Sequence, residues 1–109
     1  MDEQTDRFVL ACDLTAIETE QRQGHQALAE RLLGPTALEI VERADGYALR
    51  FGAEDYATIT RFVDNERRCC PFLRFVLDVA PGHGPVWLRI TGPEGAKAVL
   101  RAAISGPGR

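Results

Sequence analysis

The sequence lacks the features that mark several common classes of protein. It has no apolar run of about 18 residues, the length that a helix needs to cross a bilayer. Residues 1–6 lack the basic and apolar segments of a signal peptide. The longest basic run is Arg67-Arg68 and the net charge is −3 at pH 7, which argues against nucleic acid as the main partner. These absences favour a cytoplasmic protein that has no membrane or nucleic-acid partner.

Cysteine and histidine are scarce, and their spacing excludes familiar frameworks. The chain has 3 cysteines, an odd number that does not suit a disulfide framework in a reducing compartment. No Cys-x-x-Cys pair occurs, so the usual zinc and thioredoxin-like spacings are absent. The 2 histidines are His25 and His83. We expect each of them to be a solvated helix or loop residue rather than a ligand.

The amount of apolar sequence is that of an ordinary globular domain. The chain has 109 residues, of which 45% are hydrophobic, enough to bury one core without metal or disulfide crosslinks. We therefore expect a single domain over residues 1–109, with flexible ends at 1–6 and 105–109.

The hydrophobic pattern predicts alternating helices and strands. Helical spacing predicts one helix that follows a cap at Asp13 or Thr15 and ends near Leu33. Further helices are predicted over 53–69 and 95–104, and strands over 38–43, 47–51, 73–79 and 86–90. A short apolar run at 8–12 can add another strand. This predicts an α+β fold in which helices pack on one face of an antiparallel sheet of four or five strands. With a strand at 8–12, the first six elements follow the ferredoxin-like order βαββαβ.

The most chemically distinctive stretch lies between a predicted helix and a predicted strand. The apolar spacing of the second helix continues through Cys69 and Cys70, and Pro71 must end that helix. Glu66 precedes the two cysteines by one helical turn, so it shares their side of the helix. We expect the thiols to lie at a corner where the end of the helix leaves them accessible.

The residues around this corner resemble those of a known group of proteins. The motif Glu66-Arg67-x-Cys69-Cys70-Pro71-Phe72 is similar to one found in a family of small uncharacterised bacterial proteins. The resemblance extends over most of the chain, through Phe75, Trp87-Leu88-x-Ile90-x-Gly92-Pro93-x-Gly95, and Cys12 followed by Leu14. Such proteins are associated with heavy-metal resistance and metal-responsive regulators. The resemblance therefore implies a role with a thiophilic metal and supplies no assigned reaction.

Cysteine thiolates are the candidate ligands, and their softness points to the kind of ion. Cys69 and Cys70 would bind the ion, with Cys12 brought close by the fold as a third ligand. Three thiolates without a nearby histidine suit Hg(II), Cu(I) or As(III), whereas zinc would lack its fourth ligand. Arg67 would tune the charge of the thiolates, and Glu66 would order the corner. The sequence thus predicts a thiol-based binding protein for a soft metal or metalloid ion, with no organic cofactor and with a homodimer possible.

Two alternatives stay open at this point. In one, the protein is an enzyme in which Cys69 or Cys70 is a nucleophile or redox thiol and Glu66 is its base, although no histidine stands at a convincing place. In the other, the protein is a metal-free interaction module whose cysteines pack as small hydrophobic residues. Accessibility of the cysteines separates the module from the other two. Metal stoichiometry against catalytic turnover separates the binding protein from the enzyme.

Overall fold

The computed structural model describes residues 13–105, which contain three α-helices and four strands. The helices are α2 (Thr19–Leu32), α3 (Tyr56–Cys69) and α4 (Ala96–Ser105). The strands are β1 (Glu39–Arg43), β2 (Gly46–Phe51), β3 (Arg74–Val79) and β4 (Val86–Thr91). Short 3-10 turns, η1 (Leu14–Ala16) and η2 (Ala53–Asp55), precede α2 and α3. None of the helices in this part of the chain combines the length and the apolar character needed to span a bilayer.

The four strands form one antiparallel sheet in the order β1-β2-β4-β3. Both β2 and β3 run antiparallel to β4, which lies between them, so β2 and β3 are parallel to each other. The segment β2–α3–β3 is therefore a split βαβ unit. This confirms the predicted α+β fold with an antiparallel sheet. The strand proposed at 8–12 lies outside the described residues, so the ferredoxin-like order stays a prediction.

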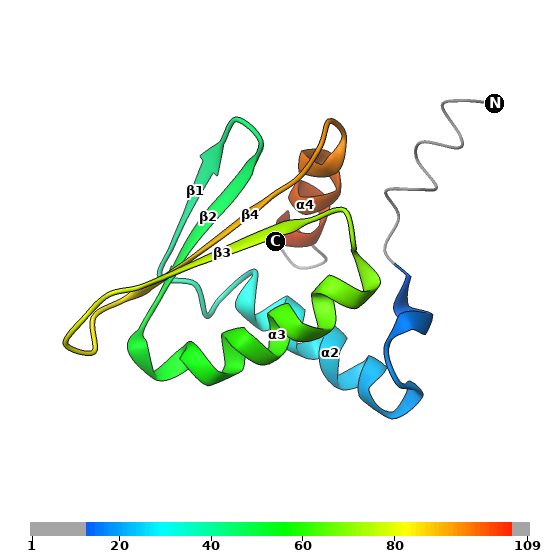
Figure 1. Ribbon diagram of the computed structural model, residues 1–109, viewed down its shortest axis with the longest axis horizontal. Helices are drawn as coiled ribbons and strands as arrows, with labels where there is room; N and C mark the ends of the chain where they lie inside the picture. Colours follow the sequence, from blue (N-terminus) through cyan, green and yellow to red (C-terminus); the bar gives the residue numbers. More distant parts are fainter. Residues whose placement is uncertain (1–12, 106–109) are drawn as a thin grey trace.

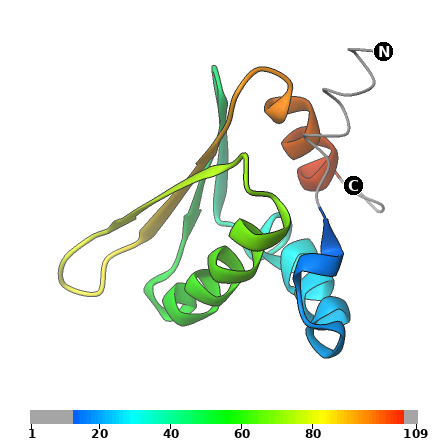
Figure 2. The same ribbon diagram turned by 45° about the vertical axis from the view of Figure 1, so that its right-hand side comes forward.

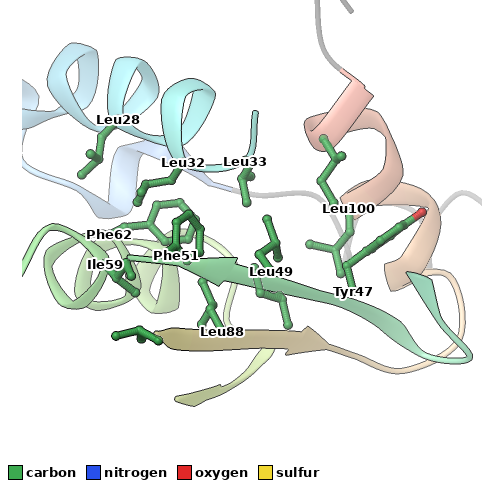
Figure 3. Close-up of a cluster of buried hydrophobic side chains, with 13 residues drawn as sticks. Leu28, Leu32, Leu33, Tyr47, Leu49, Phe51, Ile59, Phe62, Leu88 and Leu100 are labelled. Atoms are coloured by element: carbon green, nitrogen blue, oxygen red, sulfur yellow. The ribbon is translucent and has the colours of Figure 1, made fainter. Parts of the chain in front are cut away.

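The three helices lie on one face of the sheet, as Figures 1 and 2 show. Strand alternation directs one set of side chains toward them. The core that fills this space is shown in Figure 3 and includes Leu28, Leu32, Tyr47, Leu49, Phe51, Ile59, Phe62, Val86, Leu88, Ile90, Leu100 and Ile104. On β2 and β4 the side chains of one face are all buried, namely Tyr47, Leu49, Phe51, Val86, Leu88 and Ile90. The core thus joins the three helices to strands β2 and β4.

The β1–β2 hairpin depends on a glycine at a point of close backbone approach. Gly46 follows Asp45, the pair that signals a hairpin turn. A Cβ atom at Gly46 would overlap the carbonyl oxygen of Ile90 in β4. Glycine is therefore required here by the packing of β2 against β4 as well as by the turn.

The start of α2 differs from the prediction. Asp13 Oδ1 accepts hydrogen bonds from the backbone N–H of Thr15, at 3.0 Å, and from the Thr15 hydroxyl. These bonds lower the pKa of Asp13 and close the η1 turn rather than the α-helix. The helix itself begins at Thr19, with Glu18 at the N-cap position making no side-chain cap bond. The predicted cap at Asp13 therefore exists, but it serves a separate turn that precedes the helix.

Candidate metal centre at the end of helix α3

The two adjacent cysteines lie where α3 ends and the chain turns toward β3 (Figure 1), as predicted. Cys69 is the last helical residue, and Cys70 leaves the helical region with φ −127° and ψ 71°. The backbone N–H of Cys70 still donates to the carbonyl of Glu66 at 2.8 Å, and that of Leu73 donates to the carbonyl of Cys70 at 3.1 Å. Pro71, which cannot continue a helix, fixes the end of α3 at this point.

Both cysteine side chains are buried, so the expectation of accessible thiols is wrong. Cys69 is 2% exposed and Cys70 is 0% exposed, and both pack against Ile17. The segment that precedes α2 covers the end of α3, and the backbone N–H of Asp13 donates to the carbonyl of Cys69 at 2.7 Å. A helix end is accessible only when no other segment covers it, and the local sequence around the cysteines carried no sign of this long-range contact.

Glu66 links the polar atoms of the site. Its Oε2 lies 3.2 Å from the sulfur of Cys70, and its Oε1 lies 3.8 Å from the sulfur of Cys69. Oε1 also forms a hydrogen bond of 2.8 Å with Nε2 of His25. The Glu66 side chain is 16% exposed. The predicted position of Glu66 on the same side of the helix as the cysteines is confirmed, and its carboxylate contacts both sulfurs and the imidazole.

His25 is a central member of this cluster, which corrects the expectation that it is solvated. It lies on α2, is 4% exposed and stacks on Phe62, with ring centroids 5.6 Å apart. Its Nε2 contacts Glu66, while its Nδ1 is buried and has no hydrogen-bond partner within residues 13–105. One sequence signal could have located it. His25 shares helical spacing with Leu28 and Leu32, and these three are the buried residues of α2.

These contacts bring three different donor atoms together. One ligand atom each from His25, Glu66 and Cys69 lies within 4.8 Å of the others. The sulfurs of Cys69 and Cys70 are 3.7 Å apart. The described part of the site therefore offers a nitrogen and an oxygen in addition to the sulfurs of Cys69 and Cys70.

Two other residues predicted for the site are not joined to this cluster by the described structure. Cys12 lies outside the described residues, and its place as a third thiol ligand stays a prediction. Arg67 is exposed and makes no hydrogen bond or ion pair with any residue in the described range. Its proposed effect on thiolate charge likewise stays a prediction.

The two sulfurs differ in chemical state. Cys69 is a free thiol. Burial, followed by the charge of Glu66 and its hydrogen bond, raises the pKa of Cys69 from 9.0 to about 12. Cys70 is disulfide-bonded in this structure and does not titrate. Coordination of a metal by Cys70 would therefore require reduction of this bond.

The raised pKa of Cys69 bears on two kinds of thiol chemistry, nucleophilic attack and metal coordination. A thiol with so high a pKa is protonated at pH 7, and the adjacent carboxylate opposes its ionisation. It is therefore a poor nucleophile, which argues against Cys69 as the nucleophile of the enzyme alternative. A metal cation would reverse this effect, because coordination removes the thiol proton outright.

Comparison with known proteins adds no assignment. Family models, curated proteins and solved structures gave no match to this chain. The resemblance to proteins with the Glu-Arg-x-Cys-Cys-Pro-Phe motif therefore remains an expectation from the sequence. The functional argument rests on the geometry of the cluster formed by His25, Glu66 and Cys69.

Proposed function

We propose that this protein binds one thiophilic metal ion at the end of α3. Cys69 is the anchoring sulfur ligand, His25 and Glu66 are the nitrogen and oxygen ligands, and Cys70 joins them when it is reduced. The observation that carries the proposal is the convergence of three donor atoms within 4.8 Å. These residues come from two helices, and His25 and Glu66 are separated by 41 positions in the sequence, so sequence proximity alone does not explain their convergence.

The distances between the donor atoms can be compared with the distances between the ligands of a bound ion. Around zinc, with metal–sulfur bonds of about 2.3 Å and metal–nitrogen bonds of about 2.0 Å, tetrahedral ligand atoms lie roughly 3.5 Å apart. The sulfur of Cys69 is 3.8 Å from Glu66 Oε1, which is near this value. His25 Nε2 is only 2.8 Å from Glu66 Oε1, the separation of a hydrogen bond. Binding therefore requires this bond to open by a small side-chain movement.

The donor set also indicates which ions to test. One thiolate, one imidazole and one carboxylate suit Zn(II), an ion that the sequence had ranked low for want of ligands. A second sulfur from Cys70, and a third from Cys12 if it reaches the site, would shift the preference toward Cu(I), Hg(II) or As(III). The class of thiophilic ions therefore follows from Cys69 alone, and the choice within it depends on how many further cysteines are reduced and reach the ion.

Native mass spectrometry of reduced protein, with Zn(II), Cu(I), Hg(II) and As(III) offered separately, tests the proposal. We expect one ion per chain for at least one of the four. His25→Gln should weaken uptake of Zn(II) by at least about tenfold, the cost of a lost ligand contact, while the matched variant His83→Gln should leave it unchanged. Uptake of every ion at the same level by folded Cys69→Ser and by the parent would contradict the proposal. The metal-free module, in which the buried cysteines serve only packing, would then replace it.

A further inference from the structure

A second feature of the two helices is a polar hollow between them. It has a volume of about 460 Å³ and lies between α2 and α3. Gly24, His25 and Arg31 line it from α2, and Arg61, Asn65 and Arg68 line it from α3. Glu66, Cys69 and Cys70 are not among the lining residues. The hollow is therefore a separate space that shares only His25 with the group formed by His25, Glu66 and Cys69.

The rim of the hollow carries an excess of positive charge. Its charged lining residues are Arg31, Arg61, Arg68 and Asp64. Arg68 pairs with Asp64 at 3.2 Å. Neither Arg31 nor Arg61 forms an ion pair with any residue between 13 and 105. The chain as a whole has a net charge of −3, whereas the lining of this hollow has a net positive charge from Arg31 and Arg61.

Buried polar groups line the same hollow. His25 is 4% exposed and Asn65 is 8% exposed, and both are more than nine-tenths buried. Nε2 of His25 is held by Glu66, and Oδ1 of Asn65 accepts a hydrogen bond from Arg68 at 3.5 Å.

The space itself is kept open by a glycine inside a helix. Gly24 lies in the middle of α2, where glycine is less favourable than alanine. No atom lies within 4 Å of the position that its Cβ would take. The hollow is therefore open beside Gly24.

We propose that this hollow binds a small oxyanion, either a phosphate or the carboxylate of a small organic acid. The guanidinium groups of Arg31 and Arg61 would form charge-assisted hydrogen bonds to its oxygens. The side-chain amide of Asn65 would donate a hydrogen bond to the more deeply placed part of the ligand. Arg31 and Arg61 lie outside the group formed by His25, Glu66 and Cys69, so this proposal does not rest on the proposed metal site.

The test is an NMR titration of reduced, metal-free protein with inorganic phosphate and, separately, with acetate, at ionic strength held constant with chloride. We expect saturable shifts of the Gly24 backbone amide and the Asn65 side-chain amide with at least one anion. Preference for phosphate or for acetate identifies the class of ligand. Arg31→Gln and Arg61→Gln should each weaken binding by at least about tenfold, the usual effect of removing one charge-assisted hydrogen bond.

Two controls separate this site from general charge effects and from the metal site. Arg74→Gln, which removes an exposed positive charge on β3, should bind the anion as the parent does. Cys69→Ser should also retain anion binding, so failure of the metal proposal leaves this result intact. Shifts that do not saturate, or equal binding by the parent and both hollow variants, would overturn the proposal. Loss of anion binding in folded Cys69→Ser would overturn the independence of the two sites.

Discussion

At the level of single residues, Cys69 has the property that most limits what the site can do. Burial and the neighbouring Glu66 raise the pKa of its thiol from 9.0 to about 12. A thiol in this state is stable toward oxidation and alkylation, both of which proceed through the thiolate. A metal ion, in contrast, can replace the proton directly. The same surroundings that make Cys69 a poor nucleophile are compatible with a ligand that is protected until an ion arrives.

This pKa gives a prediction for alkylation of Cys69 by iodoacetamide. In the folded, metal-free protein the rate should keep rising by about tenfold per pH unit through pH 10, because the thiolate population is far from saturation. In the unfolded chain the rate should level off near the ordinary pKa of 9.0. Peptide mass spectrometry that separates Cys69 from Cys70 supplies the measurement. A folded-state rate that levels off at the same pH as the unfolded one would show that Glu66 and burial do not act as described.

The pKa of Cys69 also has a consequence for stability. Because this pKa is higher in the folded state than in the unfolded state, the thiol favours the folded state only while it is protonated. The stabilising preference for protonated Cys69 is fully present below about pH 9 and is lost as the pH rises toward 12. The free energy of unfolding of the parent should therefore fall more steeply over this range than that of Cys69→Ser. Denaturant titrations of both proteins at a series of alkaline pH values measure the difference. Parallel pH profiles for the two proteins would be the contrary result.

Residues of the site differed in how far the sequence could predict them. Glu66, Cys69 and Cys70 lie within one helical turn, so helical spacing alone placed them together. His25 joins them across 41 positions, through the packing of α2 on α3. A single histidine in one sequence gives no direct sign of such a contact. The available clue was that His25 occupies one of the apolar positions of α2, which indicates burial. The sequence pattern did not show that the buried partner would be Glu66 on α3.

At the level of elements, α2 contains a glycine whose replacement should stabilise the protein. Gly24 lies inside a helix of 14 residues, and a Cβ there would meet no atom within 4 Å. Gly24→Ala should raise the free energy of unfolding by about 0.5–1 kcal/mol, because alanine loses less conformational entropy in a helix. Chemical denaturation measures the change. A destabilised variant would mean that the space beside Gly24 is needed by the folded chain itself.

The elements also show where periodicity is informative and where it is not. Alternation located β2 and β4 within one residue, because each has one face against the core. The first helix was predicted too long, because Asp13 and Thr15 resemble a helix cap and in fact close a separate 3-10 turn. A cap residue identifies the start of a hydrogen-bonded turn, and the sequence does not state whether an α-helix or a 3-10 turn follows.

At the level of the whole molecule, the group formed by His25, Glu66 and Cys69 lies on the helical side of the sheet. The β2–α3–β3 crossover puts the end of α3 beside the start of β3, and α2 packs along α3 (Figure 2). The sequence predicted the class of the fold, since helical and strand periods alternate along it. It did not predict that β4 lies between β2 and β3, because that order depends on pairing between distant segments. The burial of the cysteine corner depends on the same kind of long-range contact.

The central claim, that Cys69, His25 and Glu66 together hold an ion, is tested most directly by X-ray absorption of the metal-loaded, reduced protein. For the zinc form we predict at least one sulfur at about 2.3 Å together with nitrogen or oxygen at about 2.0–2.2 Å. In Cys69→Ser the coordination shell should contain one sulfur fewer. A shell made only of nitrogen and oxygen would contradict Cys69 as a ligand. A shell made only of sulfur would contradict His25 and Glu66.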